Sequence, residues 1–455
     1  METAIIIIFI LGYLAITLEH NLKLDKLIPA LAMMAILWAL VAFGIDNFTN
    51  WFDSAAHALI EGFSGFTNEE RHHLLEETLL HHLGKTAEIL FFLLGAMTIV
   101  EIIDYFDGFA TFKNYIKTKK KKNLLWIFAG LAFILSAIID NLTATIVLIT
   151  ILQKIINDKE TRLWFAGLIV IAANAGGAWS PIGDVTTTML WIGKKVTSAK
   201  LIEYLIIPSI LCVVVPVFIA SFMKPFKGDL EIIEGEDNSG PASKFGPIML
   251  YLGLTAIIFV PVFKTITHLP PYVGMMLSLS VVGVFAEVFS RSQFSISHAI
   301  DVDGDDSHGF HSPVHKSLSR IEMPSVLFFF GILMAVAALE SLGMLFIGAE
   351  HLKVIIPNTD IVIMLLGVGS AVVDNVPLVA ASMGMFQEPI DDHIWHFIAY
   401  SAGTGGSMLI IGSAAGVVAM GMEKINFFWY FKNIAWLAAI GFIVGALAFM
   451  FLRQF

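Results

Sequence analysis

The sequence SAIIDN at residues 136–141 returns as SAVVDN at residues 370–375, 234 positions further along the chain. Four of the six residues are identical, and the other two exchange isoleucine for valine. Each copy places an Asp-Asn pair, Asp140-Asn141 or Asp374-Asn375, in the middle of a long apolar run. A charged residue at the centre of a bilayer costs about 2.5–3.5 kcal/mol, and such residues mark functional sites by default. The repetition therefore indicates a duplicated protein with one such site in each half.

The composition is that of an integral membrane protein. Of the 455 residues, 57% are hydrophobic and 14% are charged, whereas about a quarter are charged in soluble domains. Apolar runs of about 20 residues recur, long enough for helices across a ~30 Å hydrocarbon core. A single cysteine, Cys212, excludes a disulfide framework, and one short basic run at 119–122 gives no nucleic-acid signature. Residues 1–18 lack a basic start and a cleavage site, so we expect a first spanning helix there and no cleaved signal.

The order of these segments predicts an all-α polytopic membrane protein made of two inverted repeats. Each repeat has three spans, a re-entrant hairpin, a broken helix and a final span, which gives about 10 spans and 2 hairpins. Spans are expected at 3–18, 27–44, 87–106, 201–223, 246–263, 271–289, 323–347 and 428–452, hairpins at 124–156 and 360–387, and broken helices at 162–193 and 393–420. The first repeat then covers 1–226, a linker 227–243, and the second repeat 244–455. The polar residues 45–85 are expected to hold amphipathic surface helices at 51–63 and 69–83.

The distribution of basic residues gives an orientation. With the N-terminus outside, 19 of the 27 Lys and Arg residues fall on the cytoplasmic side, as the positive-inside rule requires. Five crossings per half make the halves inverted, so the first hairpin opens inward and the second outward. We therefore expect Asp140 and Asp374 to meet tip to tip at mid-depth, in one shared site.

Helix capping is the simplest role for an Asp-Asn pair at the start of a helix, and Pro377 suits the first turn after Asn375. Serine or threonine would cap equally well without carrying a charge into lipid. The duplicated acid therefore favours an ion site, in which side chains and the carbonyls of broken helices form an oxygen cage for a cation.

The broken helices supply further oxygen donors. Gly176-Gly177 is expected to let the backbone open. Around it lie Asn174, Ser180, Asp184, Thr186, Thr187 and Thr188, and the second copy has Ser401, Thr404, Ser407 and Ser413 but no acid where Asp184 aligns. Oxygen ligands suit a hard monovalent cation rather than a transition metal. We predict Na⁺ at Asp140, Asn141, Asp184 and Asp374, and include Thr404 among the binding residues.

The charges of the site indicate what it transports. No lysine or arginine is expected near these centres, so the site excludes anions and accepts cations or protons. A carboxylate there holds either a proton or a cation, and that competition is a mechanism for exchange. The asymmetry between the halves suggests ion binding near Asp140 and Asp184 and proton handling near Asp374. The sequence has no nucleotide-binding glycine loop, so the energy comes from an ion gradient.

The residues 140–145 (DNLTAT), 174–188 and 370–377 resemble the NhaD-type sodium/proton antiporters of the ion transporter superfamily. The resemblance implies a secondary transporter rather than an enzyme, which exchanges cytoplasmic Na⁺ (and Li⁺) for external H⁺ in pH and sodium homeostasis, without a cofactor. It implies a homodimer in the bacterial inner membrane and an elevator movement of a transport part, about 124–193 and 360–420, against a scaffold. The functional residues carried over by motif are Asp140, Asn141, Thr143, Asn174, Asp184, Thr186, Thr187, Asp374 and Asn375.

Two alternatives stay open. A sodium-coupled dicarboxylate symporter has a similar architecture, but its hairpin tips resemble Ser-Asn-Thr, and here Asp replaces Ser in both copies. An arsenite or other metalloid exporter of the same superfamily fits the same segments.

Overall fold

In the computed structural model the protein is built almost entirely of α-helices. The structure describes residues 1–18, 22–53, 58–60, 62–115, 118–230, 245–298 and 312–454. These residues contain nineteen α-helices and one antiparallel pair of two-residue strands, β1 (Phe52–Asp53) and β2 (Ala58–Leu59). The predicted all-α architecture is confirmed. Most of the predicted linker, residues 231–243, lies outside the described residues.

The helices fall into two groups. One group contains no Asp-Asn pair or broken helix: α1 (Glu2–Thr17), α3 (Leu27–Gly44), α4 (Asn68–Tyr105), α10 (Gly246–Thr267), α11 (Pro271–His298), α12 (Pro313–Leu318), α13 (Met323–Ser341) and α14 (Met344–Ile355). The other group surrounds the Asp-Asn pairs: α5 (Lys121–Ile139), α6 (Asn141–Ile155), α7 (Lys159–Ala178), α8 (Val185–Ile192), α9 (Ser198–Ala220), α15 (Thr359–Gly369), α16 (Asn375–Met385), α17 (His393–Gly405), α18 (Ala414–Glu423), α19 (Phe427–Asn433) and α20 (Ala435–Leu452).

Within the described part of the chain, nine helices are long and apolar enough to cross a membrane: α3, α4, α5, α7, α9, α10, α11, α13 and α20. The helices α1, α6, α15, α16 and α18 are apolar but shorter, with 10 to 17 residues. Many large apolar side chains on the long helices are exposed, for example Phe43 and Ile266, as lipid-facing residues are. The chain is a multi-pass membrane protein.

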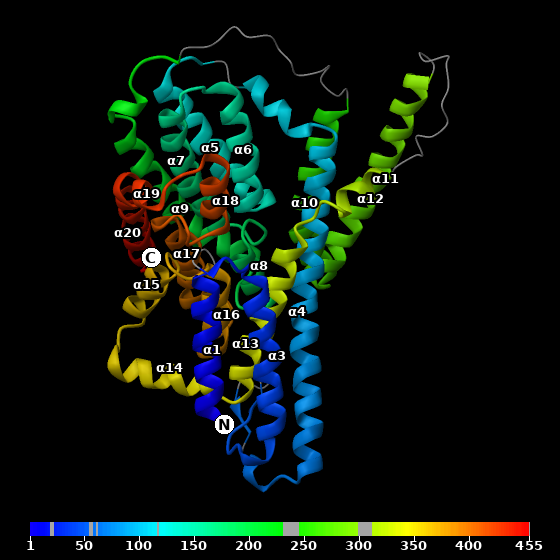
Figure 1. Cartoon of the computed structure of the whole chain (residues 1–455), viewed down its shortest axis with the longest axis vertical. Coiled ribbons are helices and arrows are strands. Elements are labelled where there is room, and N and C mark those ends of the chain that lie inside the picture. Colours follow the sequence, from blue (N-terminus) through cyan, green and yellow to red (C-terminus); the bar gives the residue numbers. More distant parts are fainter. Residues whose placement is uncertain are drawn as a thin grey trace.

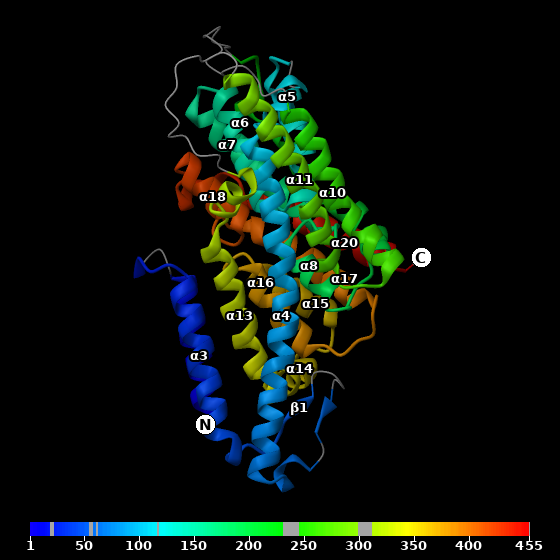
Figure 2. The same ribbon diagram turned by 90° about the vertical axis from the view of Figure 1, so that its right-hand side faces the viewer.

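The third helix of the first half is longer than predicted. α4 has 38 residues, so it contains both the surface helix expected at 69–83 and the span expected at 87–106. Its start is fixed by a capping box in which Thr67 and Glu70 bond each other's backbone N–H groups. At 1.5 Å per residue the helix is about 57 Å long, and it runs along most of the molecule (Figure 2). The prediction of a surface helix at 51–63 is wrong, because β1, β2 and a short 3-10 turn (Phe63–Gly65) occupy that region.

Both Asp-Asn pairs lie between two helices, as predicted. α5 ends at Ile139 and α6 begins at Asn141, and α15 ends at Gly369 while α16 begins at Asn375. Figure 1 shows α5 and α6 in the upper part of the molecule and α15 and α16 in the lower part. The two interrupted segments therefore approach the centre from opposite ends of the long axis. In the second half α13 ends at Ser341, earlier than expected, because Gly343 turns the chain with a φ of +70° into α14.

The glycines of the broken helices serve close packing rather than opening. α7 continues through Gly176 and Gly177 to Ala178, so the expectation that this pair opens the backbone is wrong. A Cβ atom on Gly176 would lie 2.3 Å from the carbonyl oxygen of Phe133 in α5. A Cβ atom on Gly405 of α17 would lie 2.0 Å from the carbonyl oxygen of Gly367 in α15. Glycine is needed at both positions because the first part of each broken helix touches the backbone of the hairpin in the same half.

Further contacts recur in the two halves at the offsets expected from the sequence. The Ser136 hydroxyl donates to the Ala173 carbonyl at 2.5 Å, and the Ser370 hydroxyl to the Ala402 carbonyl at 2.7 Å. The second parts of the broken helices also begin alike: Asp184 caps α8 and Ser413 caps α18, with φ/ψ of −150°/150° and −146°/154°.

Helices of the two halves also pack crosswise. α3 packs on α13 and α11 on α4, while α6 packs on α18 and α8 on α16. The second arm of each hairpin thus lies against the second part of the other half's broken helix. This arrangement brings the starts of α6, α8, α16 and α18 to the centre of the molecule, where the polar residues collect.

Candidate functional site

Asp184 joins the two hairpins. Its Oδ2 accepts hydrogen bonds from the Asn375 amide at 3.1 Å and from the Asn141 amide at 3.4 Å. The three side chains are buried, with Asp184 only 3% exposed. Asn141 is the first residue of α6 and Asn375 the first of α16, so the carboxylate lies between two helix N-termini, whose dipoles favour negative charge. The hairpin tips therefore meet through their asparagines at Asp184, and not through a direct contact of Asp140 with Asp374 as we expected.

Asn174 and Ser413 extend this cluster into the second broken helix. The Asn141 amide also donates to Asn174 Oδ1 at 3.1 Å, and the Asn174 amide donates to Ser413 Oγ at 2.9 Å. Both residues are buried. Ser413 was not among the predicted binding residues, although it stands 229 positions after Asp184 and was counted among the oxygen donors of the second half. Ser413 occupies the position in the second half that Asp184 occupies in the first, and this correspondence could have identified it as a site residue.

Asp140 caps α6 from a strained backbone. Its carboxylate accepts bonds from the Thr143 N–H at 2.8 Å and from the Thr143 hydroxyl at 2.9 Å. The capping role is therefore present at this residue. However, Asp140 has φ of 85° and ψ of 161°, a region that is almost reserved for glycine and costs on the order of 1–3 kcal/mol. Asp374, its counterpart, has an ordinary φ of −48°, so the two aspartates are not equivalent.

A lysine contacts the second aspartate. Lys26 Nζ lies 3.1 Å from Asp374 Oδ2, so the expectation that no lysine or arginine is near these centres is wrong. Lys26 is the residue before α3. The fold brings it to the tip of the second hairpin, although it is 348 positions away from Asp374 in the sequence. A contact between residues so far apart in the sequence cannot be predicted from a local sequence pattern.

The predicted threonines separate into two kinds. Thr187 donates to the Asp184 carbonyl at 2.9 Å, and Thr404 donates to the Tyr400 carbonyl at 2.6 Å within α17, so both hydroxyls hold backbone. The Thr186 N–H donates to Asp184 Oδ1 at 3.4 Å. Its hydroxyl is buried and finds no hydrogen-bond partner among the described residues. Thr186 thus places a second polar group beside Asp184.

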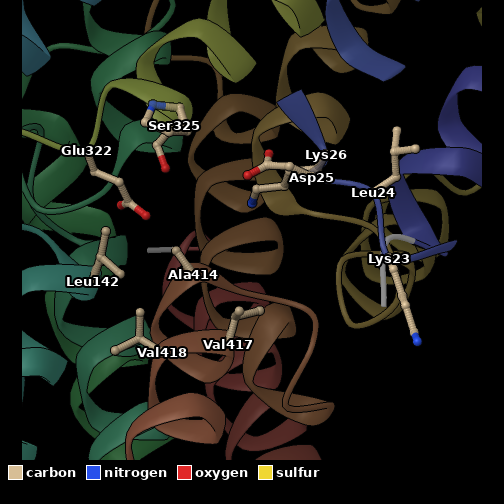
Figure 3. A pocket seen from close by; sticks show the side chains of 11 residues that line it. Lys23, Leu24, Asp25, Lys26, Leu142, Glu322, Ser325, Ala414, Val417 and Val418 are labelled. Carbon is tan, nitrogen blue, oxygen red and sulfur yellow. The ribbon is translucent and has the colours of Figure 1, made fainter. Parts of the chain in front are cut away.

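One cavity reaches the cluster, and a larger cleft lies near it. A small, nearly closed cavity of about 20 Å³ touches both Asp140 and Asp184 and is otherwise mainly apolar, with Ile139, Ile257 and Met275 in its walls. A volume of about 10–15 Å³ already holds one water molecule, so this cavity has room for one small ligand. A larger cleft of about 490 Å³ lies between the loop 23–26, the start of α13, Leu142 and the exposed face of α18. Figure 3 shows this cleft, with Lys26 in one wall and Glu322 in another.

Paired interrupted helices that enclose buried carboxylates and amides define a secondary transporter. Comparison with known proteins names the family: the chain belongs to the NhaD-type sodium/proton antiporters. The family model described as citrate transporter (CitMHS) matches residues 6–396.

Three relatives illustrate the similarity. Sodium/proton antiporter 1 of Arabidopsis thaliana is 39% identical over 99% of this chain and 72% of its own length. Sodium/proton antiporter 2 of the same plant is 37% identical over 99% of both chains. The Na(+)/H(+) antiporter NhaD of Vibrio cholerae is 30% identical over 99% of this chain and 92% of its own. These relatives are named as antiporters and not as enzymes, and the chain is a transporter.

Proposed function

We propose that the protein exchanges Na⁺, and Li⁺, for H⁺ across a membrane. The observation that carries the proposal is the buried Asp184, bonded by one asparagine from each interrupted segment. A carboxylate in such a place must be neutralised by a proton or by a cation. The names of the relatives give the ions: sodium and protons.

The proposed cation site takes its oxygen ligands mainly from two carboxylates. Asp140 and Asp184 line the small cavity, and Thr186 is bonded to Asp184 through its N–H group. The Asn141 and Asn375 amides donate to Asp184, so rotation of either amide presents its oxygen to a cation instead. Asp374, Asn174, Thr143, Thr187 and Thr404 complete the proposed binding residues. Thr143 holds the Asp140 carboxylate, and Thr187 and Thr404 fix the backbone around the site.

The exchange of Na⁺ for H⁺ follows because the two ions exclude each other from the same carboxylate. A Na⁺ ion at Asp184 or Asp140 leaves no place for a proton on the same oxygen, and a protonated carboxyl group loses its attraction for Na⁺. The Na⁺-bound and the protonated carboxylate are both neutralised and can cross an apolar environment, whereas the empty, charged carboxylate is costly there. The site therefore crosses the membrane with Na⁺ in one direction and with a proton in the other. This couples the inward flow of protons to the export of Na⁺.

We propose that the segments around the site, about 124–193 and 360–420, move as one body in an elevator motion against the remaining helices. Two clasps between the halves lie at the edges of this unit, and each joins a residue inside these ranges to one a few positions beyond them. Arg162 Nε contacts both carboxylate oxygens of the buried Glu423, at 3.2 and 3.0 Å. At the other end Asp391 accepts bonds from the Thr197 N–H at 2.7 Å and hydroxyl at 2.8 Å. Arg162 and Asp391 are 229 positions apart, the offset of the broken helices.

The inverted repeats at 1–226 and 244–455, with the linker 227–243, belong to the same proposal. So do a homodimer, a place in a bacterial inner membrane with the N-terminus outside, and a part in pH and sodium homeostasis. The opposed interrupted segments and the crosswise helix packing support the inversion (Figure 1).

Transport assays in everted membrane vesicles test the function. The vesicles are first acidified inside, and Na⁺, Li⁺, K⁺, citrate or arsenite is then added while a fluorescent probe reports the internal pH. We expect alkalinisation on addition of Na⁺ or Li⁺. Citrate is included because the matching family model carries that description. A response to citrate or arsenite alone, with none to Na⁺ or Li⁺, would contradict the proposal and favour a symporter or a metalloid exporter.

A further inference from the structure

The ion pair of Lys26 with Asp374 is a contact that the exchange reaction described above does not use. The two charged atoms are 3.1 Å apart, and the side chains are 28% and 15% exposed. The Lys26 ammonium also lies 4.5 Å from the ring centroid of Phe328 in α13. A cation over an aromatic face is held by the ring quadrupole, so two groups from different parts of the fold hold Lys26 in place.

This ion pair joins the two parts that are proposed to move against each other. Lys26 directly precedes α3, which packs on α13 in the first group of helices. Asp374 caps the start of α16 at the tip of the second hairpin. Lys26 also forms part of the wall of the 490 Å³ cleft, opposite Leu142 and Val418 (Figure 3). A cation that reaches Asp374 finds the carboxylate already paired with this ammonium group.

We propose that Lys26 is a tethered counter-ion that competes with the transported cation for Asp374, and that the cation frees the second hairpin from α3 by displacing it. The proposal rests on the proposed cation/proton exchange. It needs no change in the charge of Lys26. A lysine ammonium is a compact monovalent cation on a flexible stem, so it can leave the carboxylate and stay nearby. Phe328 and Glu322, which lines the same cleft, offer it an alternative place.

Such a counter-ion has two consequences. Asp374 is never left charged and alone while the site is empty of Na⁺, which lowers the cost of a carboxylate in a partly buried place. The connection between the two parts is also broken only when a cation has arrived. Loading of the site and release of the hairpin thereby become one event.

The first experiment measures the Na⁺ concentration that gives half-maximal proton movement in vesicles, at one fixed pH. Lys26→Gln removes the competitor, so we expect the half-saturating Na⁺ concentration to fall by about two- to fivefold, as a partly exposed ion pair would allow. Lys26→Arg keeps a competing cation and should leave the value unchanged or raise it. Lys23→Gln is the matched control, because Lys23 lies in the same loop and cleft and does not contact Asp374. An unchanged or higher half-saturating concentration in Lys26→Gln, with transport intact, would overturn the proposal.

The second experiment needs no transport activity. The purified wild-type protein is treated with an amine-acylating reagent in NaCl or in choline chloride, and the modification of each lysine is measured by mass spectrometry. We expect Na⁺ to increase the modification of Lys26 and to leave Lys23 unchanged. In Asp374→Asn, Lys26 should react strongly with or without Na⁺. Equal modification of Lys26 in both salts in the wild-type protein would refute the displacement, even if vesicles exchange Na⁺ for H⁺. Failure of wild-type vesicles to respond to Na⁺ would instead refute the proposed function.

Discussion

Replacing Asn375 by alanine tests whether the second hairpin is part of the ion site. Asn375 donates the shorter of the two amide hydrogen bonds to Asp184 Oδ2, at 3.1 Å. Both residues are buried, at 4% and 3% exposure, so water cannot easily replace the lost donor. A hydrogen bond to a charged group is worth about 1.5–3 kcal/mol. Since 1.4 kcal/mol corresponds to about a factor of ten, transport efficiency should fall about 10- to 150-fold.

The measurement is the initial rate of Na⁺-dependent alkalinisation in vesicles over a range of Na⁺ concentrations, normalised to the amount of transporter. Ser382→Ala is the matched control: Ser382 is buried in the same helix, but its hydroxyl donates to the Leu378 carbonyl within α16. We expect that variant to transport like the wild type. Transport in Asn375→Ala within about threefold of the wild type would refute the reasoning, because 1.5 kcal/mol requires about tenfold.

A double-mutant cycle sharpens the test. Asn141 and Asn375 donate to the same oxygen of Asp184. The effects of Asn141→Ala and Asn375→Ala on transport efficiency should therefore not add, since residues that share a partner couple by about 0.5–3 kcal/mol. Strict additivity would mean that the hairpins contribute to transport independently.

Three further predictions concern the site and its support. Asp140→Asn and Asp374→Asn should each abolish Na⁺-dependent proton movement in vesicles while the protein remains folded, and near wild-type exchange in either would remove that aspartate from the site. Gly176→Ala should lower the melting temperature strongly, because its Cβ would meet a backbone oxygen at 2.3 Å, whereas Gly130→Ala, with open space around the new atom, should not. Arg162→Ala should cost about 3–5 kcal/mol of stability, because it leaves a buried glutamate unpaired; an unchanged thermal unfolding curve would contradict the clasp.

Much of the fold could be predicted because membrane helices are specified locally. Apolar length and interruptions by Asp-Asn or glycine pairs marked α5–α9 and α15–α18 close to their observed places. The errors fell where local sequence was ambiguous. Residues 69–83 are polar enough for a surface helix, yet they continue into α4, because a helix lengthens without a stop signal once Thr67 has capped it. Gly176 and Gly177 looked like a break, although glycine also allows close packing, and only the partner helix shows which applies.

The candidate site was predicted in part. Asp184, Asn141, Asn174 and Asn375 do come together, and the duplication pointed to them. Thr404, in contrast, bonds within its own helix. Lys26 was missed because its contact with Asp374 depends on how α3 sits on α13. The sequence showed an asymmetry in the acids of the two halves, but it held no sign that a cation from the start of the chain would reach the second hairpin.

The difference between the halves explains how two copies of a motif can make one site. If both halves carried an acid at the start of the second part of the broken helix, two carboxylates would face each other across the cluster. The second half instead has Ser413, which accepts a bond from Asn174. One carboxylate, Asp184, can then be shared by the asparagines of both hairpins. The repeated motif supplies the two amide donors, and the serine in place of a second acid leaves one shared carboxylate at the centre, as the proposed exchange of one cation for a proton requires.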